Sequence, residues 1–291
     1  MGFGLVLEGG AMRGMFTAGV LDVFMEEGIM ADGVVGVSAG ALFGVNYLSG
    51  QKGRVIRYNK RFNADRNYIG LRPLLQEGSI VSIQYAYHQV PHHLDPFDDE
   101  QFQKSGIPFY AVVTNIRTGQ PEYIRIQSGF TQMDVLRASG SMPFVSRPVV
   151  IGNEEYLDGG ISDSIPFRWM ADQGYDKLVV VLTRDITYRK KPANAAYNLY
   201  RSRYPHFAEL LKNRYLRYNA CLEELAQWES EGKAFVIRPS CPITLATMER
   251  DPEKLQQVYD LGTRDAREAL PGLDRYLAAG KAGRCVFGRA H

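Results

Sequence analysis

One serine in this 291-residue chain stands in a pattern that nucleophilic catalysis uses. Ser38 lies between Gly36 and Gly40 in a G-x-S-x-G sequence, directly after the apolar run VVGV. A strand that enters a helix through this pattern forms a nucleophile elbow, in which small flanking residues permit a strained turn and expose the serine hydroxyl. The same short pattern also arises by chance, so the motif alone leaves two interpretations of Ser38, a nucleophile or a serine in a glycine-rich turn.

The glycine-rich loop LEGGAMRG, at residues 7–14, could bind an anion. Its residue 11 is alanine, so the loop lacks a glycine that a dinucleotide-binding G-x-G-x-x-G would need, and no Gly-Lys-Ser/Thr of a P-loop follows. Successive small residues before a helix present backbone N–H groups, which suit the oxyanion of a tetrahedral acyl intermediate. Gly10 and Ala11 are the predicted oxyanion donors, and the positive charge of Arg13 suits either a nearby phosphate or a salt bridge that holds the loop.

A serine nucleophile needs a base, and the sequence offers two kinds. Asp158 follows a short predicted strand in EYLDGG, where Gly159 and Gly160 allow the backbone to approach closely. An aspartate bonded to a serine hydroxyl accepts its proton if burial raises its pKa toward the working pH, although Asp-Gly is also an ordinary turn and cap. A histidine triad is the weaker alternative, because the histidines lie in an irregular segment, in a helical segment or at the last residue. They are His88, His92, His93, His206 and His291.

Strands and helices must bring these loops together. The runs 3–8 and 32–37 predict strands buried on both faces, and each precedes a helix, at 13–28 and directly after Ser38. This β-α-β-α opening is typical of a parallel or mixed sheet covered by helices. Further predicted strands are 107–116, 122–127, 177–183 and 234–239, with two short strands around Gly152 and Asn153.

Two regions of the chain depart from this pattern. Residues 51–105 show weak periodicity, which predicts a surface excursion or lid. We expect a catalytic core at 1–185 and a mainly helical C-terminal extension, packed on the core, at 186–291. Between Arg184 and Tyr218, nine Lys or Arg residues and six tyrosines occur with two acidic residues. This stretch suits either an anionic membrane surface or a solvated helix whose tyrosines pack on the domain.

Composition narrows the class of protein. The chain is 45% hydrophobic and 23% charged, and its net charge is +2. Because the chain has no apolar run of about 18 residues, we expect no membrane-spanning helix. The small net charge argues against a nucleic-acid partner. The beginning of the chain lacks the basic and apolar parts of a secretory signal. Three cysteines without a C-x-x-C pair argue against a disulfide framework or a cysteine-rich zinc site, and we expect a cytoplasmic protein.

In this order, LEGGAMRG, GVSAG and DGG resemble the three motifs of the patatin-like phospholipase family, over about residues 3–183. The resemblance implies a three-layer α/β/α domain around a mixed, mostly parallel sheet, and a Ser–Asp dyad that needs neither histidine nor metal nor cofactor. It makes Ser38 the nucleophile and Asp158 the base. It also makes Gly9, Gly10 and Ala11 the oxyanion hole, with Arg13 and Gly14 as supports of that loop. Two positions depart from the family pattern, since Ala11 replaces the usual third glycine and Glu8 stands where many relatives have aspartate.

The resemblance also implies an activity and a substrate class. A serine acyl hydrolase of this kind cleaves the esters of phospholipids or other acyl lipids through a covalent acyl-enzyme. An acyltransferase or a small-ester esterase could use the same dyad, and a weakly active lipid-binding protein is a third alternative. The C-terminal third resembles an extension of a bacterial subgroup, whose role the resemblance does not supply. We expect an acyl lipid or phospholipid as partner, peripheral contact at the inner membrane surface, and no nucleic acid.

Overall fold

The computed structural model describes residues 2–279, which contain one mixed sheet. The strands are β1 (Phe3–Leu7), β2 (Gly33–Val37), β3 (Phe109–Asn115), β4 (Pro121–Ile126), β5 (Val149–Ile151), β6 (Glu154–Asp158), β7 (Lys177–Val181) and β8 (Ala234–Ile237). Their order is β5-β6-β3-β2-β1-β7-β8, and β4 pairs with β3 outside this path. Neighbouring strands among β3, β2, β1, β7 and β8 pair in parallel. Strands β4 and β6 pair antiparallel with β3, and β5 pairs antiparallel with β6.

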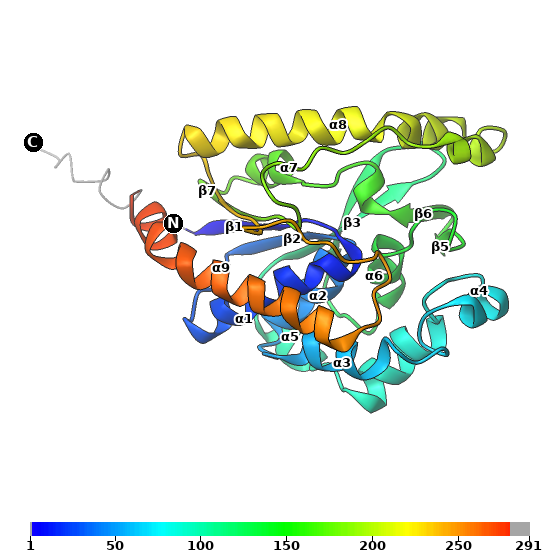
Figure 1. Cartoon of the computed structure of the whole chain (residues 1–291), viewed down its shortest axis with the longest axis horizontal. Helices are drawn as coiled ribbons and strands as arrows, with labels where there is room; N and C mark the ends of the chain where they lie inside the picture. Colours follow the sequence, from blue (N-terminus) through cyan, green and yellow to red (C-terminus); the bar gives the residue numbers. More distant parts are fainter. Residues whose placement is uncertain (1, 280–291) are drawn as a thin grey trace, which may run out of the picture.

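Helices cover both faces of this sheet. They are α1 (Met15–Glu26), α2 (Ala39–Leu48), α3 (Arg54–Phe62), α4 (Leu71–Glu77), α5 (Asp99–Lys104), α6 (Met133–Ser139), α7 (Phe167–Asp172), α8 (Pro205–Ser230) and α9 (Pro252–Ala278). Short 3₁₀ segments are η1 (Ala11–Gly14), η3 (Gly159–Ile161) and η4 (Ala195–Tyr200), and η2 (Tyr85–Leu94) is a π-helix. In the view of Figure 1, α7 and α8 lie above the sheet, and α1, α2 and α9 lie below it.

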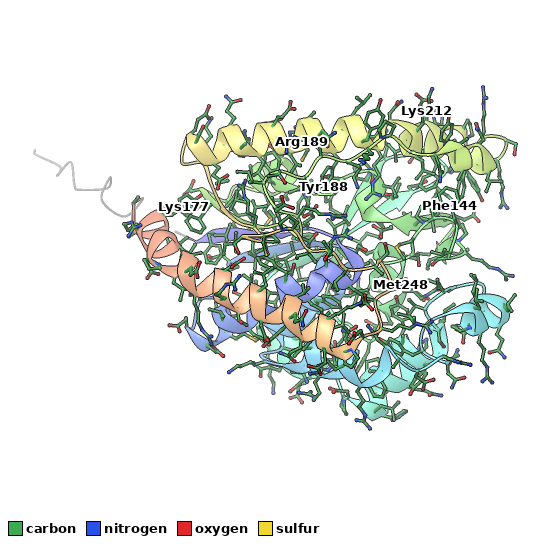
Figure 2. All side chains as sticks on the ribbon, viewed as in Figure 1. Phe144, Lys177, Tyr188, Arg189, Lys212 and Met248 are labelled. Atoms are coloured by element: carbon green, nitrogen blue, oxygen red, sulfur yellow. The ribbon has the colours of Figure 1, made fainter. Side chains whose placement is uncertain are left out.

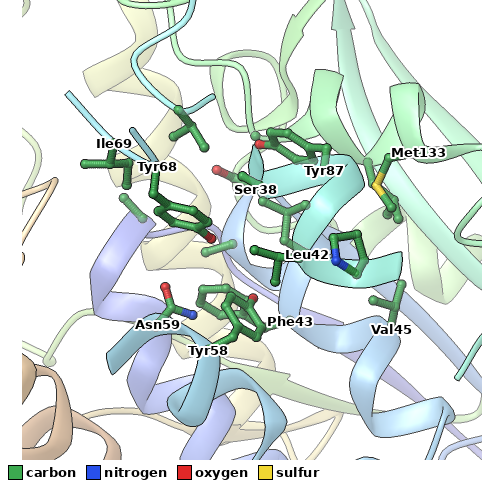
Figure 3. Close-up of a pocket in the computed structure, with 18 of the residues that line it drawn as sticks. Ser38, Leu42, Phe43, Val45, Tyr58, Asn59, Tyr68, Ile69, Tyr87 and Met133 are labelled. Carbon is green, nitrogen blue, oxygen red and sulfur yellow. The ribbon is translucent and has the colours of Figure 1, made fainter. Parts of the chain in front are cut away.

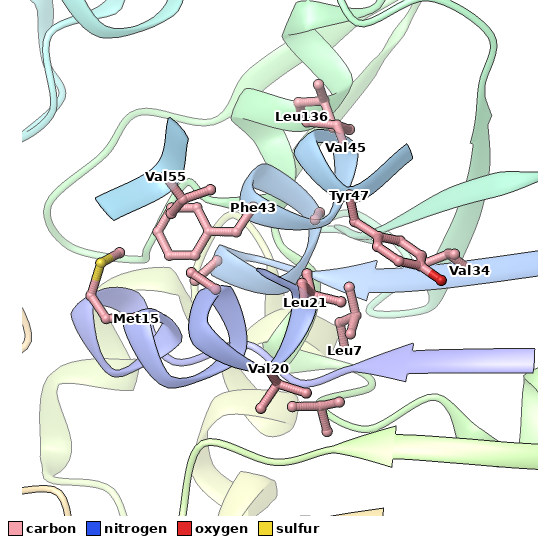
Figure 4. Close-up of a cluster of buried hydrophobic side chains, with 14 of the residues drawn as sticks. Leu7, Met15, Val20, Leu21, Val34, Phe43, Val45, Tyr47, Val55 and Leu136 are labelled. Atoms are coloured by element: carbon pink, nitrogen blue, oxygen red, sulfur yellow. The ribbon is translucent and has the colours of Figure 1, made fainter. Parts of the chain in front are cut away.

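Alternating side chains of the central strands divide the interior into two cores. On β1, Leu5 and Leu7 point into a core with α1, α2 and α9, whereas Val6 points into a core with α7 and α8. Figure 4 shows part of the first core, where Phe43 and Tyr47 of α2 lie near the sheet and α1. Burial on both faces is what the apolar runs of these strands predict. The three-layer α/β/α fold with a mixed, mostly parallel sheet is therefore confirmed.

Residues 51–105 are more regular than their weak periodicity predicts. They form α3, α4, the π-helix η2 and α5. In the π-helix, Pro91 lies inside the helix, and at its end the N–H of Asp95 donates to the carbonyl of Val90 at 2.9 Å. This five-residue spacing is not revealed by a search for a 3.6-residue period. Large side chains such as Tyr68 and Phe97 are buried, so the segment is part of the interior and not only a surface excursion.

The C-terminal region contributes to every layer. Strand β8 extends the sheet by parallel pairing with β7, while α8 covers one face and α9 the other (Figure 1). From α9, Leu255, Ala266 and Leu273 are buried in the same core as α1 and α2. Pro205 begins α8, where a proline lacks only an N–H that the first turn leaves unpaired. The region after residue 186 therefore shares its interior with the residues before it.

The basic and aromatic stretch at 184–218 turns much of its aromatic surface inward. Tyr204, Phe207 and Tyr218 are at most 9% exposed. Tyr204 and Phe207 pack in a small cluster with Leu157 at the end of β6, and Tyr218 belongs to the core beneath α7 and α8. These contacts agree with the alternative in which the tyrosines pack on the domain.

Between residues 2 and 279, no helix is at once long enough and apolar enough to cross a bilayer. Cys221 is buried, Cys241 is exposed, and both are free thiols. Cys285 lies outside the described residues.

Candidate active site

Strand β3 brings the ends of β2 and β6 together. Val112 of β3 lies opposite Val37, the last residue of β2, and the next residue, Val113, lies opposite Asp158, the last residue of β6. Because β2 is parallel to β3 and β6 is antiparallel, the two strands approach the same point from opposite directions. The residue after Val37 is Ser38, so Ser38 and Asp158 meet although they are 120 positions apart in the sequence.

Ser38 occupies a strained turn between β2 and α2. Its backbone angles, φ 54° and ψ −120°, are ones that residues with a side chain rarely adopt. Gly36 and Gly40 permit the turn, because a Cβ atom at Gly36 would lie 2.6 Å from the carbonyl oxygen of Gly40. The N–H of Ser38 donates to the Ser139 hydroxyl at 2.9 Å, which holds the turn from α6. This strand–turn–helix geometry is that of a nucleophile elbow.

Asp158 accepts the Ser38 hydroxyl in a buried setting. Ser38 Oγ donates to Asp158 Oδ2 at 2.8 Å, and the N–H of Gly160 donates to Asp158 Oδ1 at 2.7 Å. Burial raises the pKa of the Asp158 carboxyl above the ordinary 3.8, against the opposing effect of the nearby Arg214 cation. Arg214 also holds the turn, because its Nε donates to the carbonyl of Gly160 at 2.7 Å. The arrangement can transfer a proton from the serine to the carboxylate.

The first loop lies against the elbow and has free backbone donors. A Cβ atom at Gly9 would lie 2.9 Å from the Cβ of Ser38, so the loop passes directly beside the serine. The N–H groups of the predicted donors Gly9, Gly10 and Ala11 have no hydrogen-bond partner among residues 2–279, and neither has that of Ala39 at the start of α2. Free donors beside a nucleophile can bind an oxyanion.

The small residues of these turns are not equally suited to their positions. Ala11 has φ 47°, in the left-handed region, so the alanine in place of a third glycine costs about 1 kcal/mol or more. Gly14 contacts the start of α2 closely, since a Cβ atom there would lie 2.8 Å from that of Ala39. Gly159 lies against β3, where a Cβ atom would lie 2.1 Å from the carbonyl oxygen of Val112. The loop therefore contains one residue whose type opposes its conformation.

Glu8 ties the first loop to the chain after β7 and to α8. Its buried carboxylate accepts hydrogen bonds from the Thr183 N–H at 2.6 Å, the Thr183 hydroxyl at 3.1 Å and the Tyr218 hydroxyl at 2.6 Å. Burial, followed by the charge of Glu8, raises the pKa of Tyr218, so its hydroxyl remains a donor. The Thr183 hydroxyl is also within hydrogen-bond distance of the Gly9 carbonyl, at 3.0 Å. Glu8 thus anchors the first loop to Thr183, which follows β7, and to Tyr218 of α8.

Ser38 lies at one end of an apolar cavity (Figure 3). Most of the side chains that line the cavity are apolar or aromatic, as in small-molecule pockets. Figure 3 shows Tyr68 and Tyr87 on either side of Ser38, with Leu42 and Phe43 of α2 farther along the wall. A hydrocarbon chain attached to a carbonyl at Ser38 would be removed from water in this cavity.

A second cavity also reaches Ser38 and is cationic. We call it the cationic cavity, because its lining includes the side chains of Arg13, Arg184, Lys190 and Arg214. Asp158 and Tyr188 line it as well, and Tyr188 lies below α8 in the view of Figure 2. The two cavities share Ala11, Ser38 and Met142, so the candidate dyad lies at their junction.

The structure brings no described histidine to Ser38. Neither cavity that reaches Ser38 is lined by a histidine of residues 2–279. The histidines of this part are His88, His92 and His93 on the π-helix and His206, which is exposed, on α8. His291 lies outside the described residues. The same part of the chain contains no group of three His, Cys, Asp or Glu side chains placed to hold a metal ion.

From the sequence alone we did not identify the residues that hold the site from distant elements. They are Ser139, Thr183, Lys190, Arg214 and Tyr218. Ser139 and Thr183 are, respectively, 101 and 175 positions from the residues they bind. The one sequence feature that points to them is the concentration of cations and tyrosines at 184–218. By itself, this feature suits a membrane surface or a solvated helix whose tyrosines pack on the domain. Its members instead divide between the exterior, the core and the cationic cavity.

Comparison with protein families assigns both halves of the chain. The model described as patatin-like phospholipase matches residues 5–170, which contain Ser38, Asp158 and the first loop. A model described as a domain of unknown function, DUF6363, matches residues 204–278. The first match covers more than half of the chain, and the second covers α8, β8 and α9.

Individual proteins are similar to parts of this chain. The uncharacterized protein YjjU of Escherichia coli K12 is 33% identical over 185 residues, which are 62% of this chain and 51% of that protein. Lysophospholipase nte1 of Aspergillus niger is 31% identical over 180 residues, 61% of this chain and 12% of that protein. Among solved structures, VipD from Legionella pneumophila matches with a TM-score of 0.44 and 14% identity, over 93% of this chain and 67% of that one. The matched region thus spans about half of YjjU and a small part of nte1.

Proposed function

Because the chain belongs to the patatin-like phospholipase family, we propose that it hydrolyses the esters of acyl lipids, with Ser38 as nucleophile and Asp158 as general base. The observation that carries this proposal is the 2.8 Å hydrogen bond from Ser38 Oγ to the buried carboxylate of Asp158. This bond lies where an apolar and a cationic cavity meet. A lipid with a hydrocarbon chain and a polar headgroup would place its ester at this junction.

In the first half of the reaction, Ser38 Oγ attacks the ester carbonyl carbon while Asp158 accepts the hydroxyl proton. The raised pKa of Asp158 makes it a stronger base than an exposed aspartate. The proposed donors to the oxyanion are the N–H groups of Gly9, Gly10 and Ala11, together with that of Ala39. Such a donor contributes about 3 kcal/mol in other enzymes. The carbon–oxygen bond of the ester then breaks, and the leaving alcohol takes the proton from Asp158.

In the second half, a water molecule attacks the acyl group on Ser38. Asp158 accepts a proton from the water and returns it to Ser38 Oγ as the acyl–serine bond breaks. The net change is one ester and one water converted to one alcohol and one carboxylic acid. A single carboxylate therefore serves both halves, which accounts for a site without histidine.

The same geometry bears on the alternatives. An acyltransferase would use an alcohol in place of water at the second half, so the two activities differ in the acceptor and not in the dyad. The apolar lining of the cavity favours a lipid acyl chain over a small polar ester. The name of the fungal relative, lysophospholipase, supports a phospholipid with one acyl chain. The hydrogen bond from Ser38 to Asp158 favours an enzyme over a lipid-binding protein.

Labelling and turnover test the dyad together. We expect a fluorophosphonate probe to label the wild-type protein and not Ser38→Ala, and both Ser38→Ala and Asp158→Asn to lose at least about a thousandfold in kcat on an oleoyl ester. Ser141→Ala, which changes a nearby buried serine, is the control for labelling. Equal labelling of Ser38→Ala would contradict the nucleophile, and full turnover by Asp158→Asn would contradict the base. Addition of an alcohol acceptor separates hydrolysis from acyl transfer, because transfer yields a new ester.

Peripheral membrane contact is part of the proposal and involves one end of the molecule. Leu71 and Leu75 of α4 are 75% and 85% exposed, Phe144 is 48% exposed and Leu199 of η4 is 77% exposed. The chain after α4 is hydrogen-bonded to the chain after Phe144, and the rings of Phe144 and Tyr200 lie 5.4 Å apart. We call Leu71, Leu75, Phe144 and Leu199 the apolar end. Because Phe144 also lines the cationic cavity, the apolar end lies beside a route to Ser38.

A further inference from the structure

Resting on the proposed acyl hydrolase function, we propose that the cationic cavity is a phosphate subsite, which selects acyl lipids whose headgroup is a phosphomonoester. The cavity is lined by both dyad residues and by the side chains of Arg13, Arg184, Lys190 and Arg214. An ester held at Ser38 would place its headgroup among these cations while its acyl chain fills the apolar cavity. The subsite would then decide which acyl lipid is the preferred substrate.

The four cations have no carboxylate partner in the described part of the chain. Within residues 2–279, no Asp or Glu side-chain oxygen lies within 4.0 Å of any of them. The Nε of Arg13 is buried and has no hydrogen-bond partner there. Elsewhere in the interior, by contrast, the guanidinium of Arg54 lies 3.3 Å from a carboxylate oxygen of Asp95. Partly buried charges are ordinarily paired, so four unpaired cations at one cavity indicate a ligand of opposite charge.

The carboxylates of the cavity leave positive charge in excess. Only Glu8 and Asp158 contribute carboxylates to the described lining, and both accept hydrogen bonds from other groups of the protein. Four cations and two carboxylates leave an excess of two positive charges when all six groups are ionised. A phosphomonoester carries about −1.5 to −2 charges at neutral pH, so it matches this excess better than a phosphodiester or a zwitterion does.

The pKa of Lys190 shows the effect of this excess of positive charge. Burial, followed by the charge of Arg214, lowers the pKa of Lys190 to about 7, and Arg13 and Arg184 act in the same direction, whereas Glu8 acts against them. An anion bound beside Lys190 would raise this pKa again and favour the charged ammonium. The ligand and the protonated lysine would therefore stabilise each other.

The aromatic rings of the cavity argue against a choline headgroup. A quaternary ammonium group is typically bound over the faces of aromatic rings. Here the Arg184 guanidinium carbon lies 4.0 Å from the ring centroid of Tyr188, and the Lys190 ammonium lies 4.6 Å from that of Tyr218. Because these two rings already have cations of the protein over them, a further cation would meet like charge. The cavity therefore suits a bare phosphate and not phosphocholine.

The origin of the cations assigns a role to the C-terminal region. Arg13 belongs to the first motif, whereas Arg184 and Lys190 lie on the segment that follows β7 and Arg214 lies on α8. The first loop and the dyad would thus provide the reaction, and the chain after β7 would provide the headgroup preference.

Three lipids that share an oleoyl chain and differ in headgroup test the subsite. They are lysophosphatidic acid, lysophosphatidylcholine and monooleoylglycerol. We expect the highest kcat/KM for lysophosphatidic acid, by about tenfold or more, because hydrogen bonds to a charged group discriminate by at least that factor. Equal kcat/KM values for the three lipids would overturn the subsite and leave the hydrolase intact. Hydrolysis of none of them, or equal hydrolysis by Ser38→Ala, would instead contradict the proposed function.

Variants at neighbouring positions separate the cavity from overall charge. We expect Lys190→Met and Arg184→Met each to raise KM for lysophosphatidic acid about tenfold and to lower its kcat/KM relative to that of monooleoylglycerol. Lys190→Arg should restore much of the preference, which also guards against a folding effect. Lys191→Met is the matched control, because Lys191 is exposed and outside the cavity. An equal loss in Lys191→Met would overturn the subsite.

Soluble ligands distinguish a lipid headgroup from a free phosphate. We expect glycerol 3-phosphate to inhibit monooleoylglycerol hydrolysis competitively, and to inhibit Lys190→Met about tenfold more weakly. Calorimetric titration of Ser38→Ala with glycerol 3-phosphate measures the same binding without turnover, and absence of binding would overturn the proposal. Inorganic phosphate that changes kcat without competing with the lipid would identify a regulator and overturn the headgroup assignment.

Discussion

The two residues of the candidate dyad each occupy a setting that opposes stability. Ser38 keeps a strained backbone, and Asp158 keeps a carboxyl group in a buried position. The strain exposes the hydroxyl at the end of a strand, and the burial makes the carboxyl a stronger base. Surrounding groups hold both residues in place. The N–H of Ser38 donates to the Ser139 hydroxyl, and the N–H of Gly160 donates to the Asp158 carboxylate. The proposed reactivity of these two residues therefore depends on a strained backbone and a buried carboxyl group, both of which lower stability.

Ala11 offers a change that should increase stability. Its φ of 47° costs an L-residue about 1–2 kcal/mol, and glycine removes this cost while adding about 0.4–1 kcal/mol of unfolded-state entropy. We therefore expect Ala11→Gly to raise the free energy of unfolding by about 0.5–1 kcal/mol, measured by urea denaturation. Ala220→Gly, at an exposed position of α8, is the control and should lose about 1 kcal/mol. A less stable Ala11→Gly would contradict the strain.

Arg214 should govern the pH dependence of the reaction. Asp158 accepts a proton only when ionised, so kcat/KM falls as the pH falls through its pKa, which burial raises above 3.8. Arg214 acts against this rise. Removal of its charge in Arg214→Gln should therefore move the acidic limb of kcat/KM, measured on a neutral ester, to higher pH. Arg214→Lys retains a charge and should keep the limb closer to that of the wild type. An unchanged limb in Arg214→Gln would exclude this coupling.

Among the elements, β3 and α8 have the largest effect on the site. β3 pairs with β2 and β6 at adjacent positions, which places the ends of these two strands against each other. α8 supplies Tyr218 to Glu8 and Arg214 to the turn after Asp158. A helix that is late in the sequence thus fixes both the first loop and the base.

Removal of the Tyr218 hydroxyl tests this support. In Tyr218→Phe, the buried Glu8 oxygen that lies 2.6 Å from the hydroxyl loses its donor. We expect the free energy of unfolding to fall by about 1–3 kcal/mol, because an unsatisfied buried acceptor costs that much. Turnover of a neutral ester should fall as well, since Glu8 precedes the oxyanion loop. Tyr215→Phe on the same helix is the control, because the Tyr215 hydroxyl makes no hydrogen bond within residues 2–279. Equal stability of both variants would contradict the role of Tyr218.

Over the whole molecule, the proposed reaction requires an insoluble substrate to reach a buried dyad. The apolar end includes two exposed leucine side chains of α4. Figure 1 shows α4 and β5 at the same end of the molecule. Phe144, labelled in Figure 2, connects this end to the cationic cavity. A lipid could pass from a membrane surface to Ser38 without crossing the core.

Membrane contact through the apolar end can be measured directly. We expect the double substitution Leu71→Gln and Leu75→Gln to weaken binding to sedimented phosphatidylglycerol vesicles by more than about tenfold, because each buried leucine contributes roughly 1.5–3 kcal/mol. Met30→Gln is the control, since Met30 is 44% exposed but precedes β2 at the opposite end of that strand from Ser38. Equal vesicle binding by the double variant and the wild type would exclude this surface.

The sequence by itself predicted the fold class, both residues of the candidate dyad and the first loop. These inferences depend on neighbouring residues, because an elbow needs small residues two positions from its serine and a donor loop needs small residues before a helix. The strands were predictable for the same reason, since burial on both faces appears as a short apolar run. The sequence also indicated a setting without histidine, because no histidine followed a predicted strand.

Only the tertiary structure decided what surrounds the dyad. The meeting of Ser38 and Asp158 depends on the register of β3, and the convergence of Arg13, Lys190 and Arg214 depends on how the chain after β7 folds back over the first loop. Such contacts join residues far apart in the chain, and nothing in the local pattern records which partner each will have. The π-helix at 85–94, which places Tyr87 in the apolar cavity, was equally hidden. Local patterns therefore predicted the candidate dyad, while long-range packing determined the two cavities beside it.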